Sequence, residues 1–431
     1  MNSYTNRNSW LKTALFGGAC ATTAILSLLA PIGSRAVRAE LEESPKAIVD
    51  EVWQIVNREY VDGSFNQMDW QATRTELLNR DYTSAQQAYA AVRTALAKLD
   101  DPYTRFLDPD QYEQLTSQTS GELSGVGIRL ELNPETQIIT VVEPLENSPA
   151  ISAGVQAGDQ IVAIDSQPTE GMSVEQAADL IRGEVGTQVS LRLYRSDRGE
   201  FDVTLERARI ELQAVHYKVQ QEGGRNVGYI QLQEFSSHAA EQMRSAIEEL
   251  SDRDVDAFVL DLRGNPGGLL YASIDIARMW MDSGAIVQTV DRNGESHDFR
   301  ANQSAITNLP LAVLVDDNSA SASEILSGAL KDNGRATIIG SQTFGKALVQ
   351  SVHSLSDGSG LTVTIAHYYT PNGTDISHKG ITPDIVIDLS AEEERQLASD
   401  PELRGTRADP CYARAVSTLM AQLKPAPLAT Q

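Results

Sequence analysis

Two successive segments of the chain have the form of a strand, a tight turn and a helix, and this repetition restricts the fold most strongly. The first unit has the apolar strand 257–262, the turn Arg263–Gly268 and a helix with one apolar face. The second has the apolar strand 311–315, the turn Asp317–Glu324 and a helix from Ile325. Such units favour a parallel or mixed sheet, with both turns at the carboxyl ends of strands, where open α/β sheets hold their sites. The sequence therefore predicts an α/β core with its chemistry at these two turns.

The second turn places a serine at the start of a helix. A strand that leads directly into a helix lifts a side chain out of the sheet edge, and the first helical N–H groups point at the same spot without partners. Ser321 would therefore lie beside an anion site. Ser321 and Glu324 also match a capping box, in which hydroxyl and carboxylate satisfy N–H groups at the helix start. This stretch alone leaves both interpretations open.

A lysine is the best base candidate for such a serine. The chain has no Gly-x-Ser-x-Gly motif, and none of its six histidines stands in a catalytic context. Lys346 follows a glycine turn, begins a strand and shares a strand face with Gln350. The alternative is an ordinary solvated lysine at the end of a strand.

Lys346 acts as a base only when its amine is neutral. Its pKa must then fall from about 10.4 to about 7, which means destabilising the charged form by roughly 4 kcal/mol. Burial among apolar neighbours lowers the pKa, whereas a carboxylate partner would raise it. The amide of Gln350 is suitable because it hydrogen-bonds the amine without adding charge.

Two further modules precede the core. Residues 44–100 carry apolar residues at helical spacing and predict a small helical module. Residues 122–206 combine short strands with one helix, capped by Ser173 and Gln176, and begin with a glycine-rich loop at 124–127. The N–H groups of such a loop form a nest for a chain-terminal carboxylate, and the next strand offers an edge for an extended peptide. The alternative is a small β-rich module without a ligand.

The two ends of the chain differ in composition from the middle. Arg7 and Lys12 precede the mostly apolar run 13–32, and Ala39 ends a cleavage pattern of small residues. This order predicts a signal peptide, residues 1–39, that is removed after export. A retained membrane anchor and a lipoprotein site at Cys20 are the alternatives. Residues 390–431 are charged, contain proline and are weakly periodic, so we expect a C-terminal appendage.

The mature chain is strongly acidic. Of the 35 basic residues of the full sequence, four lie in the leader, so the mature chain keeps 31 against 59 acidic residues, a net charge of −28. Such a surface repels nucleic acid and anionic lipid headgroups; we expect no nucleic-acid partner, and peripheral membrane contact stays open. Cys411 is the only cysteine after the leader, which excludes an internal disulfide and a cysteine metal cluster. We expect no metal and no cofactor.

Residues 122–206 resemble a PDZ domain. The residues that match its carboxylate-binding loop are Gly125, Val126, Gly127 and Ile128. Ala153–Ile164 match its strand-and-turn signature, and the helix follows in the order that PDZ domains have. The resemblance implies a binding site for the free C-terminus of a protein.

Three motifs of the core resemble those of the carboxyl-terminal processing (tail-specific) peptidases, a serine-protease family with an inserted PDZ domain. They are Arg263–Gly268, Ser319–Glu324, and Thr343–Lys346 followed by Gln350. The likeness covers most of residues 45–388, including 99–104 and 371–384. It implies a multidomain α/β protein that consists of a signal peptide (1–39), an N-terminal helical module (40–107), a PDZ β-rich domain (108–206), a crotonase/Clp-like α/β Ser/Lys protease core (207–389) and the appendage (390–431).

The resemblance also implies roles for single residues. Ser321 would be the nucleophile, Lys346 the general base and Gln350 the residue that orients the lysine. The oxyanion hole would be formed by the N–H of Ala322 and by one N–H from Gly267 or Gly268.

Three other residues need a place in this scheme. Ser319 and Ser323 are rival nucleophiles; Ser323 fits helix capping or packing better, and Ser319 would lie before the turn. In members regulated through the PDZ domain, an arginine at the end of the PDZ helix relays peptide binding to the protease core. Arg182 occupies that place.

The implied function is an endopeptidase. It would bind the free, apolar C-terminus of a protein substrate on its PDZ domain and cut nearby through an acyl-enzyme. One alternative is a non-catalytic PDZ adaptor on an inactive protease fold, although such a copy has no need to keep Ser321, Lys346 and Gln350 together. Another is a general periplasmic quality-control protease.

The helical module carries a more specific likeness. Trp53–Asp62 and Phe65–Trp70 are similar to the photosynthetic branch of the family. That branch trims the C-terminal extension of the photosystem II D1 precursor on the lumenal side of thylakoids. Other exported members act on periplasmic proteins, so the thylakoid lumen and the periplasm both fit. The sequence gives neither the cleavage site nor the oligomeric state.

Overall fold

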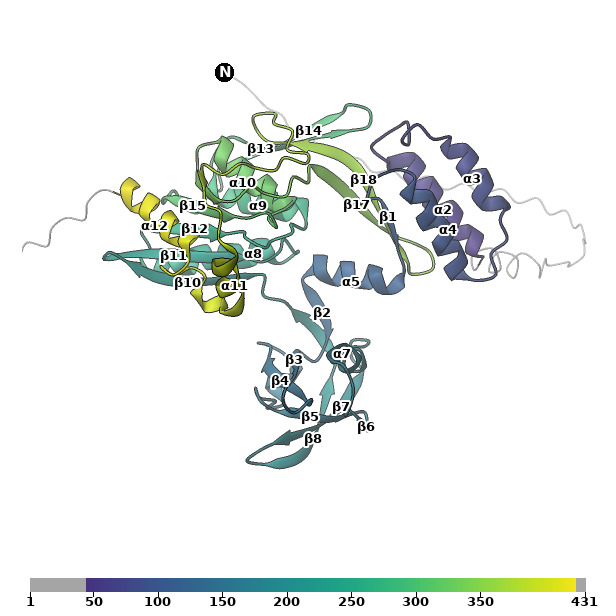
Figure 1. The fold of residues 1–431 in the computed structure, drawn as a ribbon, viewed down its shortest axis with the longest axis horizontal. Helices are drawn as coiled ribbons and strands as arrows, with labels where there is room; N and C mark the ends of the chain where they lie inside the picture. Colours follow the sequence, from purple (N-terminus) through teal and green to yellow (C-terminus); the bar gives the residue numbers. More distant parts are fainter. Residues whose placement is uncertain (1–43, 424–431) are drawn as a thin grey trace, which may run out of the picture. The chain divides into compact units, whose positions relative to one another are not determined.

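The structure is a computed structural model that describes residues 44–423. The expected signal peptide 1–39 lies outside the described residues. Between residues 44 and 423, the helices are too short or too polar to cross a membrane. The described chain folds into a central sheet covered by helices, a second sheet with a group of N-terminal helices, and a small β-rich domain (Figure 1).

The central sheet confirms the α/β core that the two strand, turn and helix units predicted. Its strands follow the spatial order β10 (Val215–Glu222), β11 (Arg225–Leu232), β12 (Ala257–Asp261), β15 (Leu311–Val315), β16 (Thr337–Gly340) and β19 (Ile385–Val386). The β10–β11 pair is antiparallel and the other pairs are parallel. Because β12 and β15 are parallel neighbours, the turns that follow them lie side by side at one edge of the sheet.

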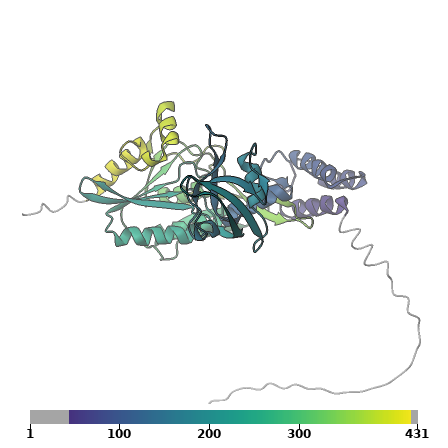
Figure 2. The ribbon, with the colours of Figure 1, turned by 90° about the horizontal axis from the view of Figure 1, so that it is seen from below.

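Helices cover both faces of this sheet, as its continuously apolar strands require. One face packs against α8 (Ala239–Asp252), α9 (Leu270–Trp280) and α10 (Ala322–Asp332). The other face packs against α12 (Pro410–Gln422). Neighbouring residues of β12 show the alternation, since Phe258 belongs to the first cluster and Val259 to the second. Figure 2 shows α8 and α12 on opposite sides of the sheet.

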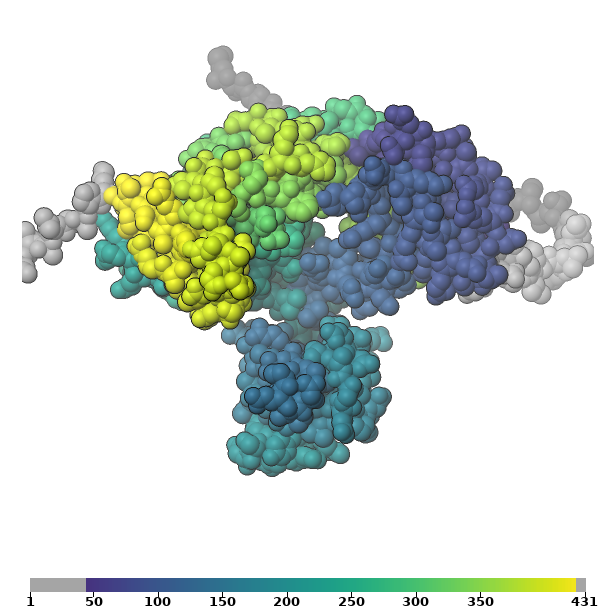
Figure 3. All heavy atoms as spheres, in the orientation of Figure 1, coloured from purple at the N-terminus to yellow at the C-terminus, as the bar shows by residue number. Residues whose placement is uncertain are grey.

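The expectation of a C-terminal appendage was wrong for α12. After α11 (Ala391–Ser399) and the short 3-10 helix η1 (Pro401–Leu403), α12 buries Tyr412, Val416 and Leu419 against the sheet. In Figure 3 the yellow C-terminal residues lie directly against the atoms of the core. The weak periodicity of residues 390–431 as a whole hid this helix, because its buried face is confined to a stretch of 13 residues.

The second sheet carries the N-terminal helical module. Its strands are β1 (Arg105–Leu107), β18 (Gly360–Tyr369), β13 (Ala285–Asp291) and β14 (Ser296–Arg300), with β17 (Leu348–Ser354) also paired to β18. The helices of the module are α2 (Pro45–Glu59), α3 (Trp70–Asn79) and α4 (Ala85–Ala97); α5 (Pro109–Ser120) follows β1, beyond the predicted end of the module at residue 107. Residues of α2 and α4 share a core with Leu361 and Val363 of β18. The predicted helical module is therefore confirmed, and it is packed onto the strand next to β17.

The β-rich domain has the order of elements that the PDZ resemblance implied. Its main sheet runs β3 (Ile128–Leu132), β4 (Ile139–Pro144), β5 (Gln160–Ile164), β7 (Gln188–Arg195) and β8 (Gly199–Glu206), with β6 (Gln167–Pro168) on β5. The remaining elements are α6 (Pro149–Ser152), α7 (Val174–Ile181) and the ribbon of β2 (Glu122–Gly125) with β9 (Ala208–Glu211). The predicted capping box of α7 is present, with Gln176 N–H on Ser173 Oγ at 3.2 Å.

Candidate active site

Ser321 lies at the junction of β15 and α10 in a rare backbone conformation. Its φ is 54° and its ψ is −111°, a region that residues with a side chain seldom occupy. Such a conformation costs about 1–3 kcal/mol and persists where the surroundings enforce it, often at active sites. Ser321 also lines a cavity of about 400 Å³. The strained turn therefore presents this serine at the cavity wall, as a nucleophile would be presented.

The capping interpretation of Ser321 holds for its backbone only. Glu324 accepts a hydrogen bond from Ser321 N–H at 2.8 Å, and Glu324 N–H donates to the carbonyl oxygen of Ser321 at 2.8 Å. Only the carboxylate half of a capping box is thus present, because the carbonyl oxygen of Ser321 takes the place of its hydroxyl as the acceptor. Within residues 44–423 the hydroxyl makes no capping hydrogen bond of its own. The Ser321 hydroxyl is left available for chemistry.

The two neighbouring serines are fully buried and have structural partners. Ser319 Oγ donates to Leu262 O at 2.9 Å and accepts from Asp316 N–H at 2.9 Å. Ser323 Oγ donates to Asn265 O at 3.0 Å. Both side chains connect the β15 turn to the turn after β12. The expected packing role of Ser323 is confirmed, and Ser321 is the serine of the three that lines the cavity.

Lys346 reaches the same cavity from the loop before β17. Its ammonium nitrogen lies 4.5 Å from the centre of the Tyr103 ring. Burial lowers the pKa of Lys346, and the nearby positive charge of Arg105 lowers it further, against the smaller opposing effects of Asp101 and Glu324. The alternative, that Lys346 is an ordinary solvated lysine at the end of a strand, therefore does not fit. A buried amine with a depressed pKa is what a lysine base requires.

Gln350, on β17, lines the same cavity as Lys346. Leu348, Val349 and Val352 line it as well, and the register with β18 shifts between Val349 and Gln350, so a β-bulge interrupts the strict alternation expected of one strand face. Gln350 Nε2 is buried and has no hydrogen-bond partner in the part of the chain that the structure describes. Within the same residues, no hydrogen bond joins the Ser321 hydroxyl, the Lys346 amine and the Gln350 amide. The three groups share one cavity and leave room between them for a substrate.

Glu324 connects the serine turn to the lysine loop, a role that the sequence did not suggest beyond capping. Its carboxylate also accepts hydrogen bonds from Gly345 N–H at 2.7 Å, Lys346 N–H at 2.9 Å and Thr343 Oγ1 at 2.6 Å. Burial raises its pKa, and these hydrogen bonds act in the opposite direction. A signal for this role was present in the sequence, because Glu324 is a charged residue among the apolar and small residues that bury the first turns of α10.

Tyr368 of β18 is a second connection that the sequence analysis missed. Its hydroxyl donates to the carbonyl oxygen of Ser321 at 3.1 Å and also contacts that of Lys346. Tyr368 is almost fully buried, and burial raises its pKa well above the usual value, so it stays a neutral donor. Glu324 and Tyr368 each contact the backbone of Ser321 and the backbone of Lys346, so together they hold these two residues in place relative to each other.

Two backbone N–H groups at the cavity have no acceptor. They belong to Ala322, at the start of α10, and to Gly268, in the turn after β12; neither donates a hydrogen bond within the described residues. Gly267 N–H is different, because it donates to Asn265 Oδ1 at 2.8 Å. Of the two glycines that the sequence left open, Gly268 therefore fits an oxyanion hole. A Cβ on Gly268 would clash with Phe235 O, so glycine is required there.

The glycine loop of the β-rich domain has the features of a carboxylate nest. Val126 and Gly127 N–H have no acceptors among the described residues, while their carbonyl groups accept from Ala150 N–H and Leu145 N–H. Gly127 has a φ of 74° and no room for a Cβ beside Ser148. In the described chain β3 pairs with β4 alone, so its other edge is open to an extended peptide.

Arg182 lies where the sequence placed it, at the end of α7. Its guanidinium pairs with Asp179 of the same helix at 3.2 Å, and both side chains are largely exposed. This pair is local to the β-rich domain.

A serine, a histidine and a carboxylate also meet away from the cavity, but their geometry does not form a triad. His353 Nε2 contacts Glu59 Oε2 at 2.7 Å and Ser351 Oγ at 2.9 Å. A catalytic histidine uses one ring nitrogen for the serine and the other for the carboxylate. Here both partners share one nitrogen, so the cluster joins α2 to β17 instead.

Known proteins share both the sequence and the fold. The peptidase family S41 model matches residues 226–387, and a PDZ domain model matches residues 140–195. The chain is 42% identical to a carboxyl-terminal-processing protease of Picosynechococcus sp. over 91% of this chain and 95% of that protein. It is also 42% identical to a carboxyl-terminal-processing protease of Synechocystis sp., over 90% of this chain and 91% of that protein. A solved photosystem II D1 C-terminal processing protease has 37% identity and a TM-score of 0.50, over 81% of this chain and 95% of that one.

Proposed function

This chain belongs to peptidase family S41 and is a carboxyl-terminal-processing serine protease with a PDZ domain, and from this premise we propose that Ser321 is its nucleophile and Lys346 its general base. The observation that carries the proposal is one cavity that holds a strained serine, a half-buried lysine with a lowered pKa, and two N–H groups that have no acceptor among residues 44–423. These are the parts that acyl transfer needs.

The reaction begins with the neutral Lys346 amine. It takes the proton of Ser321 Oγ as the oxygen attacks the scissile carbonyl carbon, and the negative oxygen that forms is held by Ala322 N–H and Gly268 N–H. The Lys346 ammonium then gives the proton to the leaving amine, and the acyl-enzyme forms. Water, deprotonated by the same amine, releases the product. Gln350 orients the amine through its uncharged amide.

The lysine base predicts a characteristic pH dependence. The amine is inactive below its pKa, because it is protonated there, so kcat/KM should rise with pH and level off above the lowered pKa of Lys346. Arg105→Gln should move this rise to higher pH and Asp101→Asn to lower pH, because these charges shift the pKa in opposite directions. Cleavage of a fluorogenic peptide across pH measures both. Arg253→Gln, at an exposed position that does not line the cavity, is the control, and an unchanged midpoint in both variants would contradict the lysine base.

We further propose that the substrate is a protein whose free, apolar C-terminus binds the loop Gly125–Ile128 and the open edge of β3. The acceptor-free Val126 and Gly127 N–H groups support this. For the physiological substrate we propose the D1 precursor of photosystem II, because a solved relative of 37% identity carries that description. Export of the chain by residues 1–39, to the thylakoid lumen or the periplasm, belongs to this proposal.

Peptides of one sequence with a free or an amidated C-terminus test this proposal. The amide lacks the charge that the N–H nest binds, so we expect at least about tenfold slower cleavage of the amide, mainly through KM. Mass spectrometry of protein C-termini in cells with and without active enzyme identifies the substrate. Equal cleavage of acid and amide would argue against recognition of the C-terminus. Trimming of many unrelated proteins would favour a quality-control protease.

A further inference from the structure

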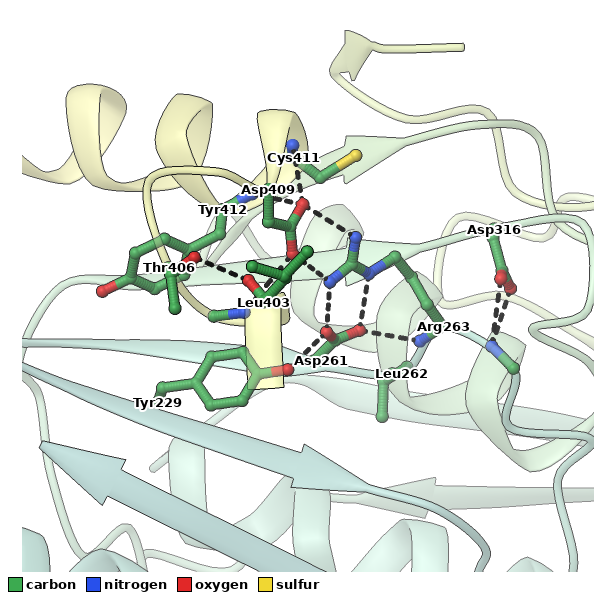
Figure 4. A network of polar contacts seen from close by, with 12 residues as sticks. Tyr229, Asp261, Leu262, Arg263, Asp316, Leu403, Thr406, Asp409, Cys411 and Tyr412 are labelled. Carbon is green, nitrogen blue, oxygen red and sulfur yellow. Dashed lines mark hydrogen bonds and ion pairs between the residues drawn. The ribbon is translucent and has the colours of Figure 1, made fainter. Parts of the chain in front are cut away.

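The turn that carries Gly268 begins with a fully buried charge cluster. Arg263, at the end of β12, donates to Asp261 from Nε at 2.9 Å and from Nη2 at 2.5 Å. It donates to Asp409, the residue before α12, from Nη1 at 3.0 Å and from Nη2 at 2.6 Å. Asp261 and Asp409 are 0% exposed and Arg263 is 6% exposed. Figure 4 shows the guanidinium held between the two carboxylates.

The C-terminal helix contributes its dipole to the cluster in addition to the carboxylate of Asp409. The cluster holds two negative charges and one positive charge, and a buried excess charge needs compensation. Asp409 is the N-cap of α12 and accepts from Cys411 N–H at 3.1 Å and Tyr412 N–H at 3.3 Å. The positive end of the helix dipole thus stabilises the excess charge. Tyr229 OH donates to Asp261 at 2.7 Å on the other side.

The turn from Arg263 to Gly268 also contacts the serine turn, so its position matters to both parts of the site. Gly264 N–H donates to the carboxylate of Asp316, and Asn265 O accepts from Ala320 N–H and Ser323 Oγ. These contacts determine how the two turns fit together. Arg263 lies where the first turn leaves the sheet, and its guanidinium is held from outside the turn by Asp409.

We propose that Asp409 is a positioning residue for peptide cleavage: from the C-terminal helix it holds Arg263, and through Arg263 the turn that presents Gly268 N–H to the developing oxyanion. The proposal rests on the proposed role of Gly268. It makes α12 a part of the catalytic apparatus, although the helix lies on the far face of the sheet from α9 and α10.

Asp409→Asn tests the proposal with little change in shape. Asparagine caps helices as well as aspartate does, so the start of α12 is kept while the charge that holds Arg263 is lost. We expect kcat to fall at least about tenfold with KM within about twofold. Affinity for a peptide aldehyde, whose adduct with Ser321 places an oxygen in the oxyanion hole, should fall by the same factor. Affinity for the cleaved product peptide should not change.

Two control variants separate positioning from folding. Val416→Ala removes buried volume from α12 and should lower the melting temperature, yet keep kcat when assayed below melting. Asp400→Asn makes the same chemical change at an exposed position of the same segment and should change nothing.

Two results would overturn the proposal. One is wild-type kcat and aldehyde affinity in Asp409→Asn; the other is an equal loss of kcat, aldehyde affinity and product affinity, which would mean general misfolding. The proposed nucleophile is tested separately, because Ser321→Ala loses the aldehyde adduct whatever Asp409 does. An inactive Ser321→Ala with a fully active Asp409→Asn would refute this inference alone.

Discussion

Ser321→Ala and Lys346→Ala should each reduce kcat/KM by about a thousandfold or more, because each removes a group that the bond-breaking step needs. The double variant should be little worse than either single one, since the two residues act as a unit. Cleavage of a peptide with a free C-terminus measures the loss, and fluorescence anisotropy measures binding of the same peptide, which should be unchanged. Lys346→Arg should also be inactive, because a guanidinium stays protonated.

Matched substitutions at exposed positions control for this experiment. Ser304→Ala and Lys98→Ala make the same chemical changes away from the cavity, and we expect wild-type rates from both. Full activity of Ser321→Ala or of Lys346→Ala would rule out the proposed pair. A wild-type protein that binds C-terminal peptides and never cleaves them would instead support the adaptor alternative.

Glu324→Gln should lower kcat about a hundredfold and also destabilise the protein. The carboxylate accepts hydrogen bonds from three backbone N–H groups and one hydroxyl. A glutamine amide has one oxygen, so its NH₂ group must face at least one buried N–H, which costs about 1–3 kcal/mol. The Ser321 turn and the Lys346 loop would then shift apart, and a displacement of about 1 Å can lower a rate about a hundredfold. Steady-state kinetics and thermal melting measure the two effects.

The chain offers a matched control for Glu324. Glu393 forms a capping box with Ser390 on α11, with Ser390 N–H on Glu393 Oε2 at 2.8 Å, and it is only partly buried. Glu393→Gln is the same change in the same local motif. If Glu324 acted only as a capping residue, the two substitutions would have similar small effects. We expect kcat to separate them by about two orders of magnitude.

Local patterns in the sequence were sufficient to predict most of the elements, and the resemblance to the family supplied the proposed roles of the site residues. The two strand, turn and helix units predicted the parallel sheet, and the turns after β12 and β15 lie side by side as expected. The capping box at Ser173 predicted the start of α7. Each of these follows from chain geometry over a few residues, which sequence periodicity records.

Other features depend on residues far apart in the chain, and only the tertiary structure decided them. Gly268 is distinguished from Gly267 by a hydrogen bond that Gly267 makes to Asn265 within the folded turn. Glu324 contacts a loop about 20 residues away, and Asp409 contacts Arg263 across 146 residues. A buried carboxylate has a partner because desolvation requires one, yet no local pattern says which part of the chain supplies it.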